Sequence, residues 1–232
     1  MFSPRLRYGG RIISANLFHA DSASLLEDCD GVSKCDHGGG SFRGYNRKGR
    51  LETQGRSGKE AKMNVAEAIR LKRAVRKFQD KPLPDEMIRS ILNAGRRSQS
   101  SKNEQGWQFI VVRDRSTLRA LSECGAYAGH LAGAAAAIAI LTPEPLAKFQ
   151  TMFDAGQAAA FMQLMALELG IGSCPASIYE HEKAREILGF PPEWHARIVL
   201  SFGYPLEEEK LFAPLRKGGR RKLEEMAHWE KW

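Results

Sequence analysis

The chain has 232 residues, 43% of them apolar, which fits one good-sized domain with a packed core. Its formal net charge of +8 is spread along the chain, with 11 basic and 7 acidic residues in 1–62, and 24 and 20 in 63–232. Because most basic residues alternate with acidic ones, we expect no nucleic-acid partner. The longest apolar run, 131–141, is about half a bilayer span, so we expect no membrane segment.

The four cysteines are too few and too scattered for a secreted fold held by disulfides. A reducing, cytoplasmic location is therefore expected. Cys29, Cys35 and His37 could be drawn as zinc ligands, but no second Cys or His pair lies at a suitable spacing to complete a tetrahedral site. We expect no metal.

Residues 1–62 differ in character from the rest of the chain. They hold 10 of the 22 glycines and show no sustained periodicity, which predicts a disordered extension before a folded domain at 63–232. Three arginines and no acid in the first twenty residues leave a transit peptide open. Translation from a non-native start, with Met63 as the natural first residue, and a basic tail that binds nucleic acid are further alternatives.

A first helix is predicted to start at Met63 or Asn64. Asn64 can cap it, and Glu67 follows at the position that a capping box requires. Val65 and Ile69 would supply the apolar stripe of this helix.

A second helix is predicted over 85–94, where apolar residues recur at helical spacing after a proline-containing break. Alternation over 107–112 predicts a mostly buried strand that follows directly. Ser116 is expected to cap a third helix, and 134–142 predicts a short buried strand.

The segment 148–170 predicts a long helix that is almost wholly apolar from residue 155 to 169. Such a helix is surrounded by protein, and a domain of this size has limited room for it, so we expect a homodimer. A compact polar stretch, 173–181, follows it. A short helix over 182–188 and a strand over 195–202 complete an α+β pattern, with helices around a central sheet.

Two polar strings carry candidate chemistry. In the first, KRAVRKF at 72–78, three cations fall within about one helical turn, where guanidinium forks and an ammonium could converge on a phosphate dianion. Two arginines near the C-terminus could close the same pocket. The alternative is that each cluster is a hydrated charge run. The candidates are Lys72, Arg73, Arg76, Gly219, Arg220 and Arg221.

The second string, SSKNEQGWQFIVV at 100–112, offers hydroxyls and amides of the kind that read the edge of a flat heteroaromatic ring. The alternative is ordinary turn chemistry that leads into the strand. These candidates are Ser100, Ser101, Asn103 and Gln105.

The stretch 175–178 contains only small residues before its last position, so its backbone amides could face a ligand closely. A main-chain N–H is a suitable partner for flavin N5, because it stabilises developing charge without adding a titratable group. These candidates are Pro175, Ala176, Ser177 and Ile178. Together with the two strings they predict a site for flavin mononucleotide (FMN).

Other cofactor and catalytic patterns are missing from the sequence. It holds neither GxGxxG nor GxxxxGK[ST], so a nicotinamide cofactor would have to bind transiently. Cys174 precedes a proline in an apolar context, which favours a buried structural thiol over a nucleophile. We expect no catalytic acid or base from the protein.

The strings resemble those of the FMN-dependent nitroreductase-like flavoproteins over about 63–232. The family's Arg-Arg-Ser-x-Arg-x-Phe-like string stands here at 72–78, and its Pro-Ser-Ser-x-Asn-x-Gln-Pro-Trp string at 99–107. Residues 153–175 resemble the family's central interface helix and its glycine-containing exit. SFGYP at 201–205 resembles the strand end that follows in the family. The basic C-terminal segment resembles the family's phosphate-contacting tail.

The resemblance implies an α+β homodimer with a central, mostly antiparallel sheet and two FMN sites built from both chains at the subunit interface. NADH or NADPH would deliver hydride, and a nitroaromatic, quinone or similar electron acceptor would then take the same place in a ping-pong cycle. By the same resemblance, Arg73, Ala74, Arg76 and Arg220 would lie at the phosphate and ribityl end, Asn103 and Gln105 would address the ring, and Ser177 or Ile178 would present an amide near N5.

The chain also departs from the family pattern. Ala74 replaces a serine and loses one hydroxyl, while Gln99 and Gly106 replace prolines and loosen a turn, which predicts weaker FMN retention. Family members that deiodinate, dehydrogenate or fragment the flavin share the fold, so fold does not fix the substrate or the choice of NADH or NADPH. A non-enzymatic protein that binds or sequesters flavin is the alternative function.

Overall fold

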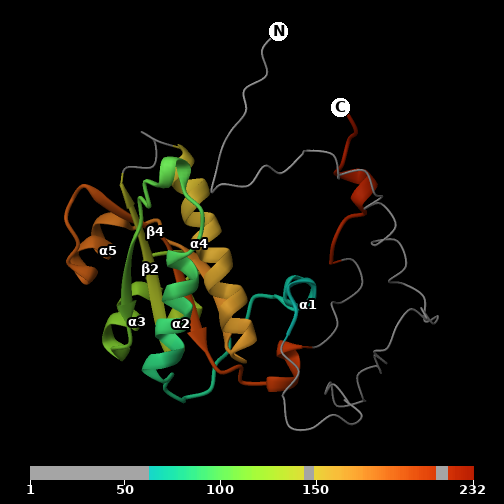
Figure 1. Cartoon of the computed structure of the whole chain (residues 1–232). Coiled ribbons are helices and arrows are strands. Elements are labelled where there is room, and N and C mark those ends of the chain that lie inside the picture. The colour runs from blue at the N-terminus through green and yellow to red at the C-terminus, as the bar shows by residue number, and fades with distance from the viewer. Residues whose placement is uncertain (1–62, 144–148, 213–218) are drawn as a thin grey trace, which may run out of the picture. The chain divides into compact units, whose positions relative to one another are not determined.

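The computed structural model describes residues 63–143, 149–212 and 219–232, and the expectations for 1–62 lie outside this part of the chain. Within it, four strands form one sheet in the order β1-β2-β4-β3 (Figure 1). All three neighbouring pairs are antiparallel, which confirms the α+β class and the antiparallel sheet. The strands are β1 (Gln108–Val112), β2 (Ala136–Pro143), β3 (Gly172–Ser177) and β4 (Trp194–Gly203).

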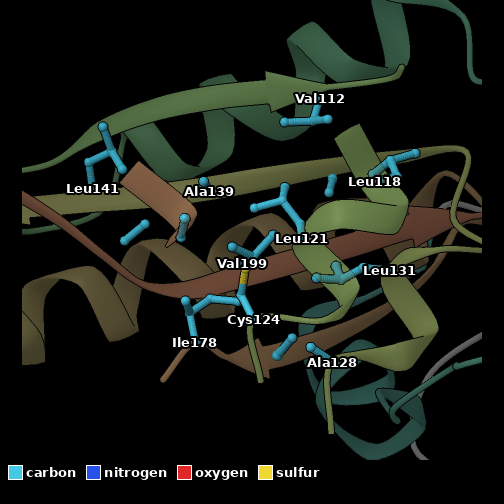
Figure 2. Packing of buried hydrophobic residues seen from close by; sticks show 14 of the residues in the cluster. Val112, Leu118, Leu121, Cys124, Ala128, Leu131, Ala139, Leu141, Ile178 and Val199 are labelled. Atoms are coloured by element: carbon cyan, nitrogen blue, oxygen red, sulfur yellow. The ribbon is translucent and has the colours of Figure 1, made fainter. Parts of the chain in front are cut away.

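Helices cover both faces of the sheet. The helices are α2 (Asp85–Arg96) and α4 (Phe149–Glu168) on one face, and α3 (Arg115–Ser122) and α5 (His181–Leu188) on the other. Successive residues of a strand point to opposite faces, so Ile138 meets α2 and α4 while Ala139 meets α3 and α5. Figure 2 shows the second layer, where Leu118 and Leu121 of α3 pack over Val199 of β4. The central strands β2 and β4 are thus covered on both faces. The prediction of a mostly buried strand over 107–112 is wrong for β1, because this strand lies at an edge of the described sheet and only Val112 of its five residues is buried.

Helix α1 (Val65–Leu71) begins where the sequence predicts. Oδ1 of Asn64 accepts the amide of Glu67 at 2.9 Å, which confirms the predicted cap. The two residues of the predicted apolar stripe, Val65 and Ile69, are 72% and 63% exposed in the single chain. The helix packs in this chain through its other side.

Helix α4 runs along the sheet for 20 residues (Figure 1). One side of it belongs to the core of this chain, through Ala155, Ala158 and Met162. Another side presents the aromatic rings of Phe149, Phe153 and Phe161, which are 76%, 69% and 41% exposed. Within the described ranges, none of the helices has the length and apolar character needed to cross a membrane.

Two local details differ from the sequence predictions. The cap of helix α3 is Asp114 and not Ser116, because Oδ2 of Asp114 accepts the amide of Thr117 at 2.8 Å. A carboxylate at this position also interacts favourably with the helix dipole. The polar stretch after α4 contains strand β3, which the sequence analysis did not predict. Pro175 is tolerated there because β3 lies at an edge of the described sheet.

Candidate functional site

The predicted phosphate-binding string runs extended after α1 ends. Lys72 has φ −57° and ψ 124°, and Ala74 forms a parallel bridge with Ser173 of β3. The expectation that Lys72, Arg73 and Arg76 share one helical turn is therefore wrong. Backbone pairing with the sheet edge is the physical reason.

Two glycines let the string lie against the ends of β3 and β4. A Cβ on Gly172 would lie 2.7 Å from Cγ1 of Val75, and a Cβ on Gly203 would lie 2.8 Å from Cδ1 of Phe78. Side chains do not approach so closely, so the absence of a Cβ is required at both positions. The amide of Val75 also donates to the carbonyl of Ser173 at 3.0 Å. The string is thus held by backbone pairing and by two close contacts.

The cations of the string gather near the start of β3. Burial lowers the pKa of the Lys72 ammonium, while the Cys174 thiol acts to raise it. Burial raises the pKa of that thiol, and Arg76 and Lys72 act in the opposite direction. Lys72 donates from Nζ to the carbonyl of Arg73 at 3.0 Å. Cys174 is 1% exposed, which confirms the predicted buried thiol.

A histidine without a predicted role lies beside this cluster, just before β2 in the short 3₁₀ helix η2, residues 129–131. Nδ1 of His130 lies 2.9 Å from Oγ of Ser201, which donates to the carbonyl of Cys174 at 3.2 Å. Burial lowers the pKa of His130, Arg76 lowers it further, and the backbone of Pro175 acts to raise it. His130 and Ser201 are 71 residues apart, so no sequence spacing could have indicated their contact.

The second predicted string, 100–112, was expected to contact the flavin ring. It adopts an unusual backbone conformation around the 3₁₀ turn η1 (Ser101–Asn103). Lys102, Asn103 and Gln105 have φ values of 52°, 57° and 50°. This left-handed region costs a non-glycine residue on the order of 1–3 kcal/mol. Three such residues in one exposed loop favour a ligand-binding role, because backbone strain clusters at functional sites.

Two oxygen atoms hold this loop in place. The amide of Ser101 donates to Oδ2 of Asp154 at 2.8 Å, and the amide of Gln105 donates to Oγ of Ser100 at 3.0 Å. Asp154 lies on α4 and is 7% exposed. The sequence analysis did not identify Asp154, although a carboxylate in an apolar helix was the available signal. Nε2 of Gln105 lies 3.3 Å from Oδ1 of Asn103, so the two candidate amides are neighbours.

The stretch predicted to face flavin N5 is the end of β3. Pro175 and Ser177 are exposed, while Ala176 and Ile178 are buried. The amide of Ile178 donates to the carbonyl of Arg197 at 2.9 Å and is therefore occupied. Because amides alternate in direction along an edge strand, that of Ser177 points away from β4. The pairing favours Ser177 over Ile178 as the amide donor.

The loop after α3 supports this end of β3. The carbonyl of Cys124 accepts the amide of Tyr179 at 2.8 Å. A Cβ on Gly125 would lie 2.1 Å from the carbonyl oxygen of Ser177, so a glycine is required where the loop contacts the strand. The position of Ser177 is thus fixed from two sides, by β4 and by this loop.

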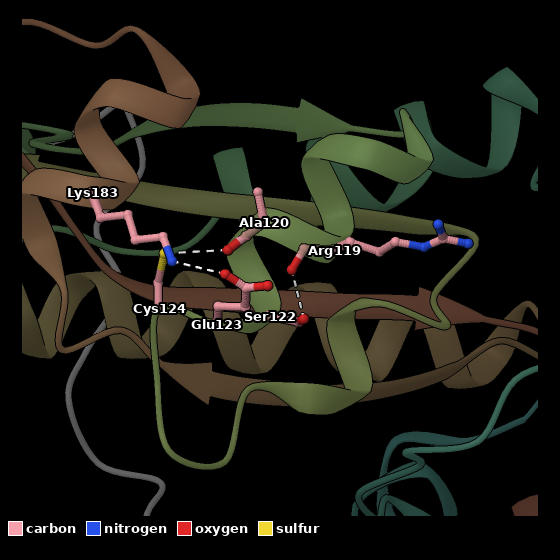
Figure 3. A network of polar contacts seen from close by, with 6 residues as sticks. All are labelled: Arg119, Ala120, Ser122, Glu123, Cys124 and Lys183. Carbon is pink, nitrogen blue, oxygen red and sulfur yellow. Dashed lines mark hydrogen bonds and ion pairs between the residues drawn. The ribbon is translucent and has the colours of Figure 1, made fainter.

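An ion pair joins the residue that follows α3 to helix α5, at the start of the same loop (Figure 3). Nζ of Lys183 lies 2.8 Å from Oε2 of Glu123 and holds the pKa of that carboxyl below its ordinary value. Beside it, Sγ of Cys124 donates to the carbonyl of Ala120 at 3.5 Å. Both charged side chains are exposed, so the pair contributes little to overall stability.

The basic residues of the C-terminal segment are exposed. Arg220 donates from Nη1 to the carbonyl of Gly219 at 2.9 Å, and Arg221 is exposed beside it. The structure describes 219–232 after a gap in the described chain. Closure of the phosphate pocket by these residues stays a prediction. Cys29, Cys35 and His37 lie outside the described residues.

The two predicted halves of the site lie at opposite ends of α4. The bond between Ser101 and Asp154 places the ring-reading loop near the start of this helix. Leu71, just before the basic string, packs in one cluster with Leu167 near the helix end. With a rise of about 1.5 Å per residue, Asp154 and Leu167 are about 20 Å apart along the helix axis. One chain therefore does not bring the loop and the string together.

This architecture, an antiparallel sheet between two helical layers with a cationic string on its edge, is the one expected of nitroreductases. The chain belongs to the nitroreductase family: the sequence profile described as "Nitroreductase family" matches residues 69–128 and 119–204. The family resemblance seen in the sequence is thereby confirmed.

Individual relatives agree with this membership. A protein of Archaeoglobus fulgidus, provisionally named NADH dehydrogenase/NAD(P)H nitroreductase, is 34% identical over 171 residues, which cover 71% of this chain and 96% of that protein. A protein of Methanothermobacter thermautotrophicus with the same provisional name is 33% identical over 184 residues, or 75% and 91% of the two chains. The structure of an FMN-dependent nitroreductase from Clostridium difficile matches with a TM-score of 0.64 and 28% identity, and covers 72% of this chain and 100% of that one.

Proposed function

We propose that the protein is an FMN-dependent NAD(P)H oxidoreductase of the nitroreductase type, with flavin sites built from two copies of the chain. When bound, FMN supplies the redox centre that takes a hydride from NADH or NADPH and reduces a nitroaromatic, quinone or similar acceptor in a ping-pong cycle. Three features support the proposal, and each offers a different part of a flavin site: the string on the edge of β3, the outward amide of Ser177 and the strained loop 100–105.

The phosphate end fits the residues of the extended string. Arg76 is exposed and Lys72 is half-buried, and both act electrostatically on the same thiol, that of Cys174. A phosphate dianion at this place would offset the cost of burying the Lys72 ammonium. A guanidinium matches phosphate geometry through paired N–H donors. Arg73, the backbone of Ala74, and Gly219, Arg220 and Arg221 complete the proposed phosphate and ribityl site.

The ring end uses main-chain and amide groups. The amide of Ser177 points away from β4 and can donate to N5 without a titratable proton of its own. Asn103 and Gln105 lie on an exposed loop with Ser100 and Ser101. This loop lies at the end of α4 opposite to the basic string, so a flavin whose phosphate lies at the string of one chain would have its ring contacted by the loop of a second copy.

A homodimer is supported by apolar side chains that one chain leaves exposed. They lie on two helices that pack together, α1 and α4. Exposed apolar patches of this kind mark interfaces, and two chains paired through α4 could bring the loop of one to the string of the other. The exposed residues are Val65, Ile69, Phe149, Phe153 and Phe161. A reducing, cytoplasmic location is part of the proposal and is supported by the buried free thiols of Cys124 and Cys174.

The visible absorption spectrum after FMN addition and desalting tests the proposal. A retained flavin band that NADH or NADPH bleaches without oxygen, and that a nitroaromatic or quinone restores, is the expected result. The Arg76→Gln variant should retain less FMN, whereas Arg89→Gln, which changes an exposed arginine on α2, should match the wild type. A band that neither donor bleaches would indicate a flavin-sequestering protein, and failure to retain flavin would refute the proposed site.

A further inference from the structure

His130 has one ring nitrogen, Nε2, that is buried and makes no hydrogen bond of good geometry among the described residues, although the Pro175 backbone lies near enough to the ring to act on its pKa. The neighbours of the other ring nitrogen, Nδ1, determine whether it carries the proton. Ser201 has a single hydroxyl proton, which it donates to the carbonyl of Cys174 at 3.2 Å. Its oxygen therefore accepts from Nδ1 of His130, 2.9 Å away. In the neutral ring Nδ1 carries the proton and Nε2 carries a lone pair.

The charge that acts on this ring is a cation. Arg76 of the phosphate-binding string lowers the pKa of His130, and Lys72 of the same string acts on the adjoining Cys174. Helix α3, which packs on η2, brings Arg115, whose Nη1 donates to the Ala134 carbonyl at 3.1 Å.

The contacts from β3 and β4 are uncharged at neutral pH, since they are the Cys174 and Pro175 backbone, the Cys174 thiol and the Ser201 hydroxyl. Arg115 is itself paired with Asp80, whose side chain is exposed. Burial and Arg76 therefore keep the ring neutral at pH 7 while no anion is bound.

We propose that His130 is a positioning residue of the flavin site that takes up a proton at Nε2 when the phosphate of FMN binds beside Arg76. This inference rests on the proposed function. The dianion offsets the repulsion between Arg76 and the ring, so one proton from solvent is bound with FMN and released with it. The charged ring then adds a cation to the phosphate end, and it strengthens the hydrogen bonds through Ser201 to Cys174, three residues before Ser177.

The test measures FMN and riboflavin affinity by fluorescence quenching of the apoprotein between pH ~6 and ~8.5. The wild type is compared with His130→Gln, which keeps a hydrogen-bonding side chain but has no proton that titrates. One linked proton strengthens binding by up to about tenfold for each unit of falling pH. We expect the wild type and the variant to bind FMN alike at high pH and to diverge as the pH falls. The phosphate's own second proton, with a pKa of about 6, affects both proteins equally and cancels in the ratio.

Riboflavin is the matched control because it lacks the phosphate, and it should show no divergence between the two proteins. A second measurement uses the wild type alone, so it does not depend on the variant folding. Nitrogen NMR of the ring should show Nε2 change from unprotonated to protonated when FMN is added at neutral pH.

Three results would overturn the inference: a ring that stays neutral with FMN bound, FMN profiles that do not diverge, or riboflavin profiles that diverge as strongly as those of FMN. If the wild type binds no flavin at all, the proposed function fails and the inference fails with it. That outcome is distinguishable because it is seen before any variant is made.

Discussion

The amide of Ser101 donates to the carboxylate of Asp154 at 2.8 Å and so joins two segments that are 53 residues apart. Asp154 is 7% exposed and lies on the helix that runs the length of the site. Ser101 comes directly before Lys102, the first of three residues with positive φ. A hydrogen bond from an amide to a buried carboxylate is therefore the anchor of the strained loop that presents Asn103.

We expect Asp154→Ala to loosen this loop. Loss of a hydrogen bond to a charged group costs about 1.5–3 kcal/mol, so urea unfolding should show a loss of that order. FMN affinity, measured by fluorescence quenching, should fall about tenfold or more by the same reasoning. Asp154→Asn is the matched control, since it keeps an oxygen acceptor for the Ser101 amide. Wild-type FMN affinity in Asp154→Ala would show that the loop holds its conformation without this anchor.

Gly172→Ala should weaken the attachment of the basic string to β3. The new methyl group would lie 2.7 Å from Cγ1 of Val75, and such overpacking costs about 1–3 kcal/mol. Adding Val75→Ala removes both γ carbons but leaves its Cβ at 2.8 Å, so we expect partial rescue in a double-mutant cycle of unfolding free energies. Gly133→Ala, where a Cβ would meet no described atom within 4 Å, is the control. Additive effects at 172 and 75 would contradict the contact.

The N-cap of α3 predicts an acid-dependent contribution to stability. The Ser116 hydroxyl, followed by the amide and hydroxyl of Thr117, lowers the pKa of Asp114 to about 2. Because the folded-state pKa lies below the unfolded value of about 3.9, the stabilisation is present above that value and is lost as the pH falls toward 2. Asp114→Asn is an equally good cap without the charge. Its stability should therefore lack this part of the decrease at acid pH. The measurement is melting temperature against pH for both proteins, and parallel curves would contradict the assignment.

The sequence predicted what depends on neighbours along the chain. The Asn64 cap needs only the amide of Glu67, three residues further along the chain. The apolar composition of α4 can be read directly from its amino-acid sequence. The sequence failed where a distant partner decides the conformation. The basic string reads as a helical turn until Ser173 pairs with Ala74, and that pairing makes it extended.

The same limit applies to the site. Ser100, Asn103 and Gln105 could be proposed because their side-chain chemistry is visible in the sequence. Asp154 and His130 were missed because each contributes through one contact with a residue far along the chain, Ser101 and Ser201 respectively. The preference for Ser177 over Ile178 also required the register between β3 and β4, which residue types alone do not specify.

The exposed side of α4 leads to the last prediction. Phe153 is 69% exposed, and Ile69 of the neighbouring helix α1 is 63% exposed. If two copies pair through this surface, Phe153→Glu places a charge in an apolar interface and should cost about 2 kcal/mol or more of association energy. We expect the variant to sediment as a monomer at concentrations where the wild type is a dimer.

Flavin binding should be lost together with the dimer, because the loop at 100–105 and the string at 72–78 lie at opposite ends of one helix and only a second copy could bring them together. Arg119→Glu, on α3 and therefore on the other face of the sheet, should leave both properties unchanged. A monomeric Phe153→Glu with wild-type FMN affinity would place the whole site within one chain and would refute the two-chain arrangement. A dimeric variant would place the interface elsewhere, since a buried glutamate at this position could not be accommodated without a partner for its charge.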